Sequence, residues 1–208
     1  MRRFTAEYLE TTREGMWEDS TAALADLALE QRQRVLDVGA GTGELTRLLR
    51  ETVPGEVIAA DADADLLAHT DDPRVLADAT RLPFADDSFD LVICQALLVN
   101  LAVPEVALRE FARVSSDCVA VVEPDNSAVS VTSTVDNESQ LAKEARELYL
   151  AGIGTDATIG DARSLFAEAG IEDARVRRYD HRQTVSPPYT EQALEAARRK
   201  ASGAGIET

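Results

Sequence analysis

The sequence predicts a doubly wound α/β fold built on a mostly parallel sheet. From Gln33 onward, short runs of Val, Ile and Leu alternate with amphipathic stretches, which is the pattern of repeated strand-helix-strand units. The 208 residues, 45% of them hydrophobic, suffice for one sizeable core. We therefore expect one main domain over 31–185, preceded by a helical cap over 1–30 and followed by a helical tail over 186–208.

The first half of the chain contains three of the predicted strands. Each is a short run of apolar, partly β-branched side chains, and the three cover 35–38, 57–60 and 75–77. The helix between the first two extends from 43 to 51 and places Leu45, Leu48 and Leu49 on one face. A shorter helix is expected at 63–69. Strands and helices thus alternate, as the crossover connections of a parallel sheet require.

The second half continues the alternation and then loses regularity. Three further strands are predicted at 89–94, 118–122 and 174–179. Helices are predicted at 104–114, 140–150, 162–169 and 191–202. Pro104 suits the first turn of its helix because its fixed φ is already helical, and Gly170 stands at the usual capping position after the third of these helices.

The charge balance argues against nucleic-acid and anionic-membrane partners. Asp and Glu total 38 and Lys and Arg total 21, which gives a formal net charge of -17. Phosphate groups repel a chain of this charge unless its basic side chains gather into a patch. Only Lys143 and Lys200 are lysines, and this balance resembles proteins of halophilic archaea, where concentrated salt screens self-repulsion. An acidic protein from a GC-rich genome is the alternative.

The cysteines, histidines and apolar windows predict neither a metal site nor a membrane span. Cys94 and Cys118 lie in apolar runs without a Cys-x-x-Cys pair, so we expect reduced core residues. His69 and His181 have no ligand-spaced partner, and no metal is predicted. The longest apolar window, 91–103, is shorter than the ~20 residues of a membrane-spanning helix, and the N-terminus lacks a signal-peptide pattern. We expect a cytoplasmic monomer or homodimer.

The segment 37–44, Asp-Val-Gly-Ala-Gly-Thr-Gly-Glu, is the most informative in the chain. A strand that leads into Gly39-x-Gly41-x-Gly43 and then a helix is typical of a nucleotide-binding loop, since glycine allows a tight turn and close approach of a ligand. Dinucleotide folds place the third glycine one residue later, where this chain has Glu44. Acids at both ends of the segment would also repel a pyrophosphate. A ligand that carries an ammonium, a sulfonium and one carboxylate fits better.

Two further acids follow the next two strands. Asp61 lies 22 residues beyond Gly39, the distance at which a carboxylate can accept from both hydroxyls of a ribose, a feature shared with NAD sites. Asp78 could accept from the amine of an adenine ring, while the amide of Ala79 donates to a ring nitrogen. Because parallel strands end at the same edge of a sheet, Asp37, Asp61 and Asp78 are expected around one crevice.

The stretch 82–90, Leu-Pro-Phe-Ala-Asp-Asp-Ser-Phe-Asp, completes the pattern. Together with the glycine segment and the strand-end acids, it resembles the class I S-adenosylmethionine-dependent methyltransferases, most closely the small-molecule enzymes with a Leu-Pro-Phe-x-Asp-x-Ser-Phe-Asp stretch. The resemblance covers 34–126. It implies a Rossmann-like sheet of order 3-2-1-4-5-7-6. After Tyr179 the sequence offers no convincing seventh strand, and 182–189 supplies at most a distorted one.

The resemblance also implies the residues of the cofactor site. Asp37 would orient the methionyl amine, Asp61 would hold the ribose hydroxyls, and Gln95 after the fourth strand would lie near the methyl group. The full implied set is Asp37, Gly39, Ala40, Gly41, Gly43, Asp61, Ala62, Asp78, Ala79 and Gln95. The implied cofactor is S-adenosylmethionine, and the implied acceptor is an unidentified small molecule.

Methyl transfer makes few demands on catalytic side chains. Transfer from a sulfonium is an in-line displacement, so proximity and desolvation of the nucleophile carry much of the catalysis. A general base is needed only for an acidic acceptor. Gln95 and Glu123, which follow or end the fourth and fifth strands, are the candidate catalytic residues, and Glu123-Pro124 is alternatively a turn that ends its strand. Further side chains expected near the methyl group are Asn100, Asp125 and Asn126.

Other functions stay open from the sequence alone. One alternative is a methyltransferase-like domain that binds the cofactor without turnover. Another is an NAD(P)-dependent reductase, although the chain lacks the Tyr-x-x-x-Lys pair of the short-chain form. Ser186-Pro187-Pro188-Tyr189 is similar to a motif of amino-methylating enzymes that grip a flipped base, but it lies roughly 90 residues too late in the chain, so we expect a turn.

Overall fold

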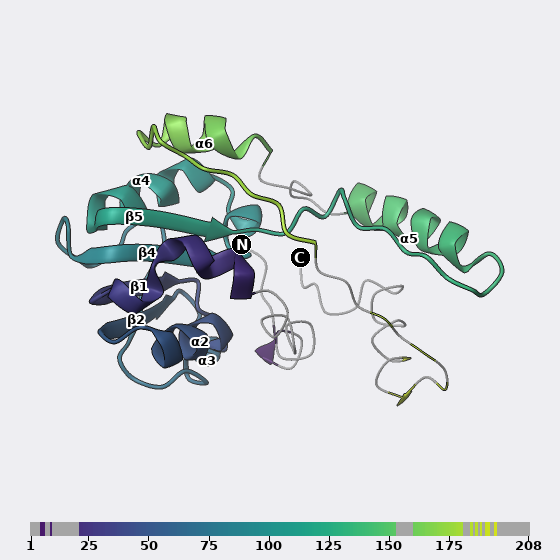
Figure 1. The fold of residues 1–208 in the computed structure, drawn as a ribbon, viewed down its shortest axis with the longest axis horizontal. Coiled ribbons are helices and arrows are strands. Elements are labelled where there is room, and N and C mark those ends of the chain that lie inside the picture. The colour runs from purple at the N-terminus through teal and green to yellow at the C-terminus, as the bar shows by residue number, and fades with distance from the viewer. Residues whose placement is uncertain are drawn as a thin grey trace.

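The computed structural model describes residues 5, 6, 9, 21–152, 160–180, 184, 186, 188, 190, 191 and 194. It contains a five-stranded sheet in which all neighbouring strands run parallel, with helices on its two faces (Figure 1). The strands are β1 (Arg34–Val38), β2 (Glu56–Asp61), β3 (Arg74–Leu76), β4 (Phe89–Gln95) and β5 (Ser115–Val122). Their order, β3-β2-β1-β4-β5, confirms the doubly wound α/β fold and the first five positions of the predicted strand order.

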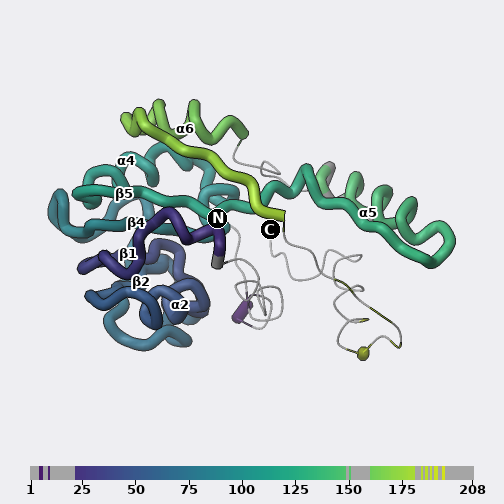
Figure 2. The backbone as a smooth tube through the Cα atoms, viewed as in Figure 1, coloured from purple at the N-terminus to yellow at the C-terminus, as the bar shows by residue number. Residues whose placement is uncertain are grey.

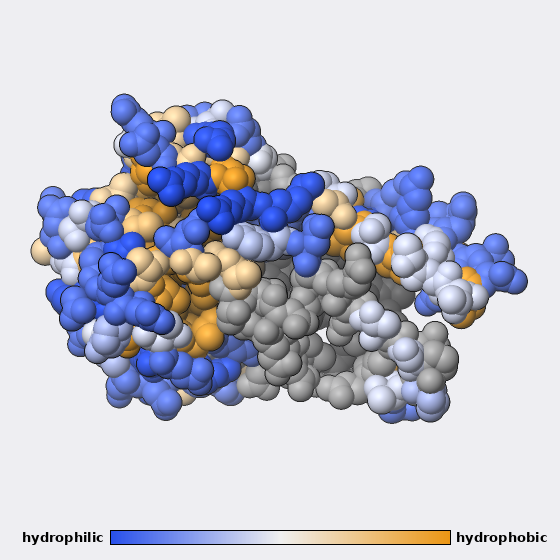
Figure 3. Space-filling model, in the orientation of Figure 1, coloured by the Kyte–Doolittle hydropathy of each residue, from blue (hydrophilic) through white to orange (hydrophobic). Residues whose placement is uncertain are grey.

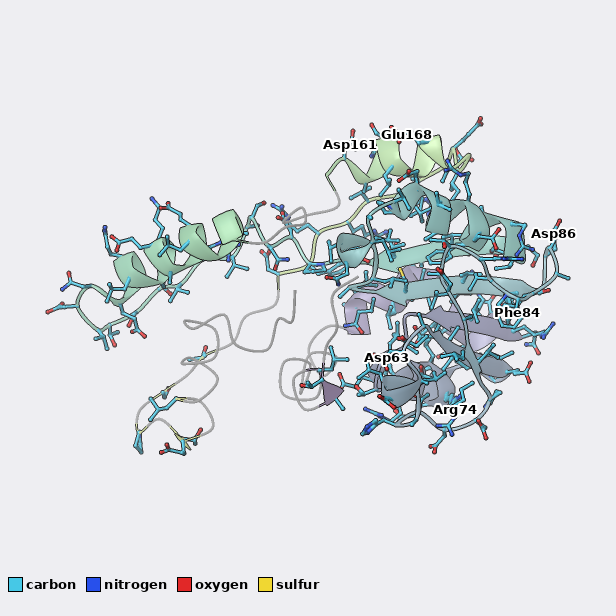
Figure 4. The ribbon with its side chains drawn as sticks, turned by 180° about the vertical axis from the view of Figure 1, so that it is seen from behind. Asp63, Arg74, Phe84, Asp86, Asp161 and Glu168 are labelled. Carbon is cyan, nitrogen blue, oxygen red and sulfur yellow. The ribbon has the colours of Figure 1, made fainter. Side chains whose placement is uncertain are left out.

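Helical segments connect the strands, and η marks those that are 3-10 helices. They are η1 (Thr21–Leu27), η2 (Leu29–Gln31), α2 (Glu44–Thr52), α3 (Ala64–Leu67), η3 (Leu98–Asn100), α4 (Pro104–Val114), α5 (Glu138–Gly152) and α6 (Ala162–Glu168). Pro104 occupies the first turn of α4, as predicted. Asp63 and Asp161 accept hydrogen bonds from backbone amides at the starts of α3 and α6 (Figure 4). Short polar side chains thus determine where these two helices begin.

The two faces of the sheet bury separate hydrophobic clusters. Leu36 of β1 belongs to one cluster with Phe111 of α4. The preceding residue, Val35, belongs to the other cluster with Leu49 of α2 and Leu24 of η1. Successive side chains of a strand point to opposite faces, so both faces of β1 are buried. This explains why the strands are continuous apolar runs rather than alternating ones.

The helical cap predicted over 1–30 lies only partly within the described residues. From Thr21 onward the chain forms η1 and η2 rather than one continuous helix. Ala28 separates them with a φ of 51°, a left-handed conformation that interrupts helical hydrogen bonding. Leu24 and Leu29 are nevertheless buried and belong to the hydrophobic cluster on the α2 side of the sheet.

The sixth strand predicted at 174–179 is wrong, because residues 171–180 have no regular secondary structure. In Figures 1 and 2 the segment runs back from α6 toward the end of β5. Within the described residues the sheet ends at β5, so no strand pairs with this segment, and its Arg177 and Arg178 form ion pairs with Asp26 of η1 and Asp125 after β5. Only scattered residues of the possible seventh strand at 182–189 and of the tail over 186–208 lie within the described part of the chain.

The stretch 82–90 is anchored to α4 by two charged side chains. Arg113 donates to the carbonyls of Leu82 and Phe84, at 3.1 and 2.8 Å, and pairs with Asp86 at 2.8 Å. Glu110 accepts a hydrogen bond from the amide of Leu82 at 2.9 Å and also pairs with Arg113. The pKa of Glu110 is lowered, chiefly by its hydrogen bond with Arg113. This part of the recognised motif therefore has a structural role in joining β3 to β4.

The helix α5 extends away from the sheet (Figures 1 and 2). Its Leu141 and Leu148 are 61% and 76% exposed. Figure 3 shows hydrophilic residues over most of the face in view, with apolar residues gathered over the sheet and along α5. In the part of the chain that the structure describes, no helix combines the length and apolarity needed to cross a bilayer.

Candidate cofactor site

The glycine segment forms the turn between β1 and α2. Gly39, Gly41 and Gly43 have φ values of 73°, 55° and 82°, all in the left-handed region that side chains disfavour. Gly43 is also the residue from which α2 begins. Three left-handed residues within five explain why the sequence has glycine at every second position here, and they confirm the predicted strand-turn-helix arrangement.

Most amides of this turn donate hydrogen bonds within the protein. Those of Gly39 and Ala40 both donate to the carbonyl of Ala60, at 2.7 and 3.1 Å, and that of Gly43 donates to the carbonyl of Ala40 at 2.9 Å. A pyrophosphate-binding loop instead directs such amides at the phosphate oxygens. The turn is therefore poorly suited to a dinucleotide, which agrees with the glycine spacing.

Asp61 ends β2 and closes onto the glycine turn. Its Oδ2 accepts a hydrogen bond from the amide of Gly41 at 2.7 Å, and its Oδ1 accepts from the amide of Asp63 at 2.8 Å. A carboxylate offers about four lone-pair positions, so about two remain for further donors. Two hydroxyls of a ribose would occupy them. Ala62, which follows, is exposed.

Two side chains outside the predicted site hold the glycine turn in place. The hydroxyl of Thr70 donates to the carbonyl of Gly41 at 3.3 Å, and a Cβ placed on Gly43 would lie only 2.6 Å from that hydroxyl oxygen. A Cβ placed on Gly39 would lie 2.9 Å from Cδ1 of Leu97. Sequence reasoning missed both residues, because only the fold brings them close to the turn.

Asp37 is buried near the carboxyl end of β1, the central strand of the sheet. It is 1% exposed, and the hydroxyl of Thr46 on α2 donates to its Oδ2 at 2.6 Å. The β1 ladder pairs Asp37 with Ala59 on one side and Ile93 on the other. The carboxylate thus fixes α2 against β1 directly below the glycine turn.

Asp78 and Ala79 follow β3 by two and three residues. The Oδ1 atom of Asp78 accepts from both the amide and the hydroxyl of Thr80, at 2.8 and 2.7 Å. The backbone hydrogen bond from Thr80 is the main reason that the pKa of Asp78 is lowered. Asp78 is exposed and Ala79 is buried. An ionised, exposed carboxylate therefore lies at this end of the sheet, as an adenine amine would require.

Gln95 and Glu123 lie at the carboxyl ends of the neighbouring strands β4 and β5. Gln95 is 4% exposed and pairs with Val122 in the ladder. Glu123 accepts hydrogen bonds from three successive amides of the turn after β4, those of Leu97, Leu98 and Val99. Burial raises the pKa of Glu123 to about 7, although these amides oppose the rise. The sequence predicted that Glu123 lies at the carboxyl edge of the sheet, but not that it binds the turn after β4.

The remaining predicted side chains lie in different surroundings. Asn100 donates to the carbonyl of Ala96 at 2.8 Å. Asp125 accepts from Ser127 and pairs with Arg178, so it stabilises the chain after β5. His181 lies outside the described residues, and of the Ser-Pro-Pro-Tyr stretch only Ser186 and Pro188 lie within them. Within the described ranges, no three His, Cys, Asp or Glu side chains are grouped to hold a metal ion.

One buried hydroxyl in the glycine turn also fits a bound ligand. Thr42 is 2% exposed, and among the described residues its Oγ1 has no hydrogen-bond partner. Buried polar atoms are nearly always hydrogen-bonded, so such an atom at a candidate site is a place for a polar ligand group. Together with the acceptor positions on Asp61, it makes the turn suitable for a small polar ligand.

Comparisons with known proteins agree with this geometry. Residues 36–117 match the family described as a methyltransferase domain. A demethylmenaquinone methyltransferase of Corynebacterium urealyticum is 40% identical over 103 residues, which are 48% of this chain and 44% of that protein. The chain thus matches less than half the length of that relative.

Two solved structures share the fold. A Bacillus halodurans protein aligns with a TM-score of 0.55 and 21% identity, covering 74% of this chain and 68% of that one. A SAM-dependent methyltransferase of Aquifex aeolicus aligns with a TM-score of 0.54 and 20% identity, covering 73% and 89%. Residues 36–117, which run from β1 into β5, are thus similar to a methyltransferase domain, and the two solved structures share the fold of this sheet.

Proposed function

We propose that the chain is an S-adenosylmethionine-dependent methyltransferase that acts on a small-molecule acceptor. The observation that carries the proposal is the carboxylate of Asp61, which binds the Gly41 amide and keeps about two acceptor positions for a ribose. The engaged amides of the turn argue against a pyrophosphate, and the acids around it favour a cationic ligand. An adenosyl sulfonium meets all three conditions.

The proposed roles follow the placement of each residue. Asp61 holds the ribose hydroxyls, Asp78 and Ala79 contact adenine, and Asp37 orients the methionyl amine from beneath the turn. Gln95 lies near the methyl group. The proposed cofactor-binding residues are Asp37, Gly39, Ala40, Gly41, Gly43, Asp61, Ala62, Asp78, Ala79 and Gln95.

The chain contributes positioning rather than covalent chemistry. S-adenosylmethionine supplies an electrophilic methyl group on a sulfonium that leaves as a neutral thioether. Gln95 is buried at the end of β4, so it can orient a polar acceptor group while water is excluded. Glu123 is committed to three backbone amides, which weakens its candidacy as a general base. We therefore assign no base.

The acceptor is proposed to be a small molecule. The net charge of -17 disfavours a nucleic acid, which would need clustered basic side chains. The Corynebacterium relative is named for demethylmenaquinone, but the family match lies in the cofactor half of the chain. A demethylated quinol is therefore one of several small acceptors to be tested and is not assigned as the substrate.

Two assays test this proposal against its alternatives. S-adenosylmethionine should raise the melting temperature of the protein in molar KCl, which screens the self-repulsion of a chain with a net charge of -17. Release of S-adenosylhomocysteine with a panel of small acceptors would then establish turnover. Binding of S-adenosylmethionine without turnover of any acceptor would favour the methyltransferase-like domain that binds the cofactor but does not catalyse transfer. A melting shift with NADH and none with S-adenosylmethionine would favour the NAD(P)-dependent reductase.

A further inference from the structure

The turn between β4 and η3 has a strained conformation that needs support. Ala96 has a φ of 49°, which a non-glycine residue adopts only when its surroundings impose it. Its amide donates to the carbonyl of Val122 at 2.9 Å, and its carbonyl accepts from the side chain of Asn100 at 2.8 Å. Both contacts hold Ala96, the first residue of the turn. The backbone amides of the next three residues donate to another group.

That group is the carboxylate of Glu123. Its Oε1 accepts from the amides of Leu97 and Leu98 at 3.0 and 2.9 Å, and its Oε2 accepts from the amide of Val99 at 3.3 Å. Only an acceptor can bind three converging N–H groups, and a carboxylate is an acceptor at both oxygens. Glu123 therefore fixes the backbone from which the side chain of Leu97 projects.

Leu97 in turn lies against the glycine turn. Three of its side-chain carbons lie 2.9–3.2 Å from the position that a Cβ of Gly39 would occupy. On its other side, Gly39 is held by the hydrogen bond from its amide to Ala60 at 2.7 Å. Gly39 is thus confined between the end of β2 and Leu97, so a displacement of Leu97 would leave it free to move.

We infer that Glu123 is a positioning residue for the cofactor: it holds Leu97 against Gly39 and so sets the affinity of the glycine turn for the adenosyl ligand. This inference builds on the proposed function. It differs from the base role, because Glu123 acts through Leu97 and touches neither cofactor nor acceptor.

The environment of Glu123 makes its effect dependent on pH. The thiol of Cys94 on β4 lies 3.9 Å from its Oε1, and Asp37 on β1 lies close enough to Cys94 to raise the pKa of that thiol further. Burial is the main cause of that rise, so the thiol stays protonated near neutrality. Glu123 titrates in this range, because burial raises its pKa to about 7. Protonation converts one acceptor oxygen into a donor, which opposes the amides.

The experiment measures the affinity of the full chain for S-adenosylmethionine by calorimetry between pH 6 and pH 8.5. The wild type should bind more tightly as the pH rises through 7, whereas E123Q should bind roughly tenfold more weakly at pH 8 and show no such step, since its amide nitrogen cannot accept. E110Q is the matched control: Glu110 also accepts from a backbone amide and pairs with Arg113, but it lies on α4 away from the glycine turn. It should keep the wild-type affinity and pH step.

Leu97 provides the second arm of the test. L97A should weaken binding as E123Q does, and the double variant should be no weaker than either one, because both act through one contact. L97M, which keeps the volume, should restore most of the affinity. Wild-type affinity and pH step in E123Q would overturn the inference while leaving the proposed function intact. Failure of the wild type to bind S-adenosylmethionine would instead refute the proposed function.

Discussion

The carboxylate of Asp61 accepts a hydrogen bond from the amide of Gly41 at 2.7 Å, so the end of β2 and the glycine turn form one unit. The same carboxylate accepts from Asp63 at the start of α3. One side chain therefore organises the turn, the strand end and the start of the next helix.

Replacement of Asp61 should show that ligand binding depends on this one carboxylate and not on the acidic surface in general. D61A removes the ribose acceptor and two backbone hydrogen bonds, so the melting shift caused by S-adenosylmethionine should be lost and the ligand-free stability should fall by about 1–3 kcal/mol. D65A is the control, because Asp65 is an exposed acid of α3. Differential scanning fluorimetry compares them, and an undiminished shift in D61A would contradict the assignment.

A methyl group added to Gly43 should lower the free energy of unfolding far more than one added to another left-handed glycine. Gly43 and Gly170 have φ values of 82° and 86°, but the added Cβ meets Thr70 at 2.6 Å in the first and open space in the second. G170A should cost roughly 1 kcal/mol of backbone strain, and G43A should cost more by about 1–3 kcal/mol of overpacking. Urea denaturation measures both. T70A should recover part of the loss in G43A, and equal costs for the two glycines would show that Thr70 does not confine the turn.

The anchor of the 82–90 stretch predicts a stability effect at Arg113. R113A leaves the carbonyls of Leu82 and Phe84 without their donor, so the unfolding free energy should fall by about 1–3 kcal/mol. R113K should recover little, because lysine lacks the planar fork that reaches several acceptors at once. The control R109A removes an exposed arginine of the same helix and should change stability by less than about 0.5 kcal/mol. Full recovery in R113K would show that charge alone suffices.

Glu123 should also leave a signature in the pH dependence of ligand-free stability. Its pKa is about 7 in the folded chain and near 4.5 when unfolded, so between these values the folded state binds the extra proton. The contribution to stability is therefore complete below 4.5 and is lost as the pH rises through 7. The difference in unfolding free energy between wild type and E123Q should decline across this window. A constant difference would mean that Glu123 has no raised pKa.

The sequence predicted those features that depend on local pattern and spacing. The five strands, the left-handed glycines and the position of Asp61 at the end of β2 follow from apolar runs, glycine spacing and a fixed separation along the chain. Thr70 and Leu97 could not be predicted in the same way, since they reach the turn from segments 27 and 58 residues away, as the numbering from Gly43 and Gly39 gives.

One error and one omission have the same physical origin. Apolar and arginine residues alternate over 174–177, which imitates a strand, but among the described residues no strand beyond β5 pairs with this segment. Glu123 was recognised as an acid at a strand end, yet its role depends on three amides of a turn more than 20 residues earlier. Sequence patterns report local preference, whereas tertiary contacts determine which preference prevails.

The central claim is tested most directly by equilibrium binding of radiolabelled S-adenosylmethionine to the full chain in molar KCl. The account predicts saturable binding at one site per chain, displaced by S-adenosylhomocysteine and unaffected by NADH. Absence of saturable binding, or displacement by NADH, would contradict it.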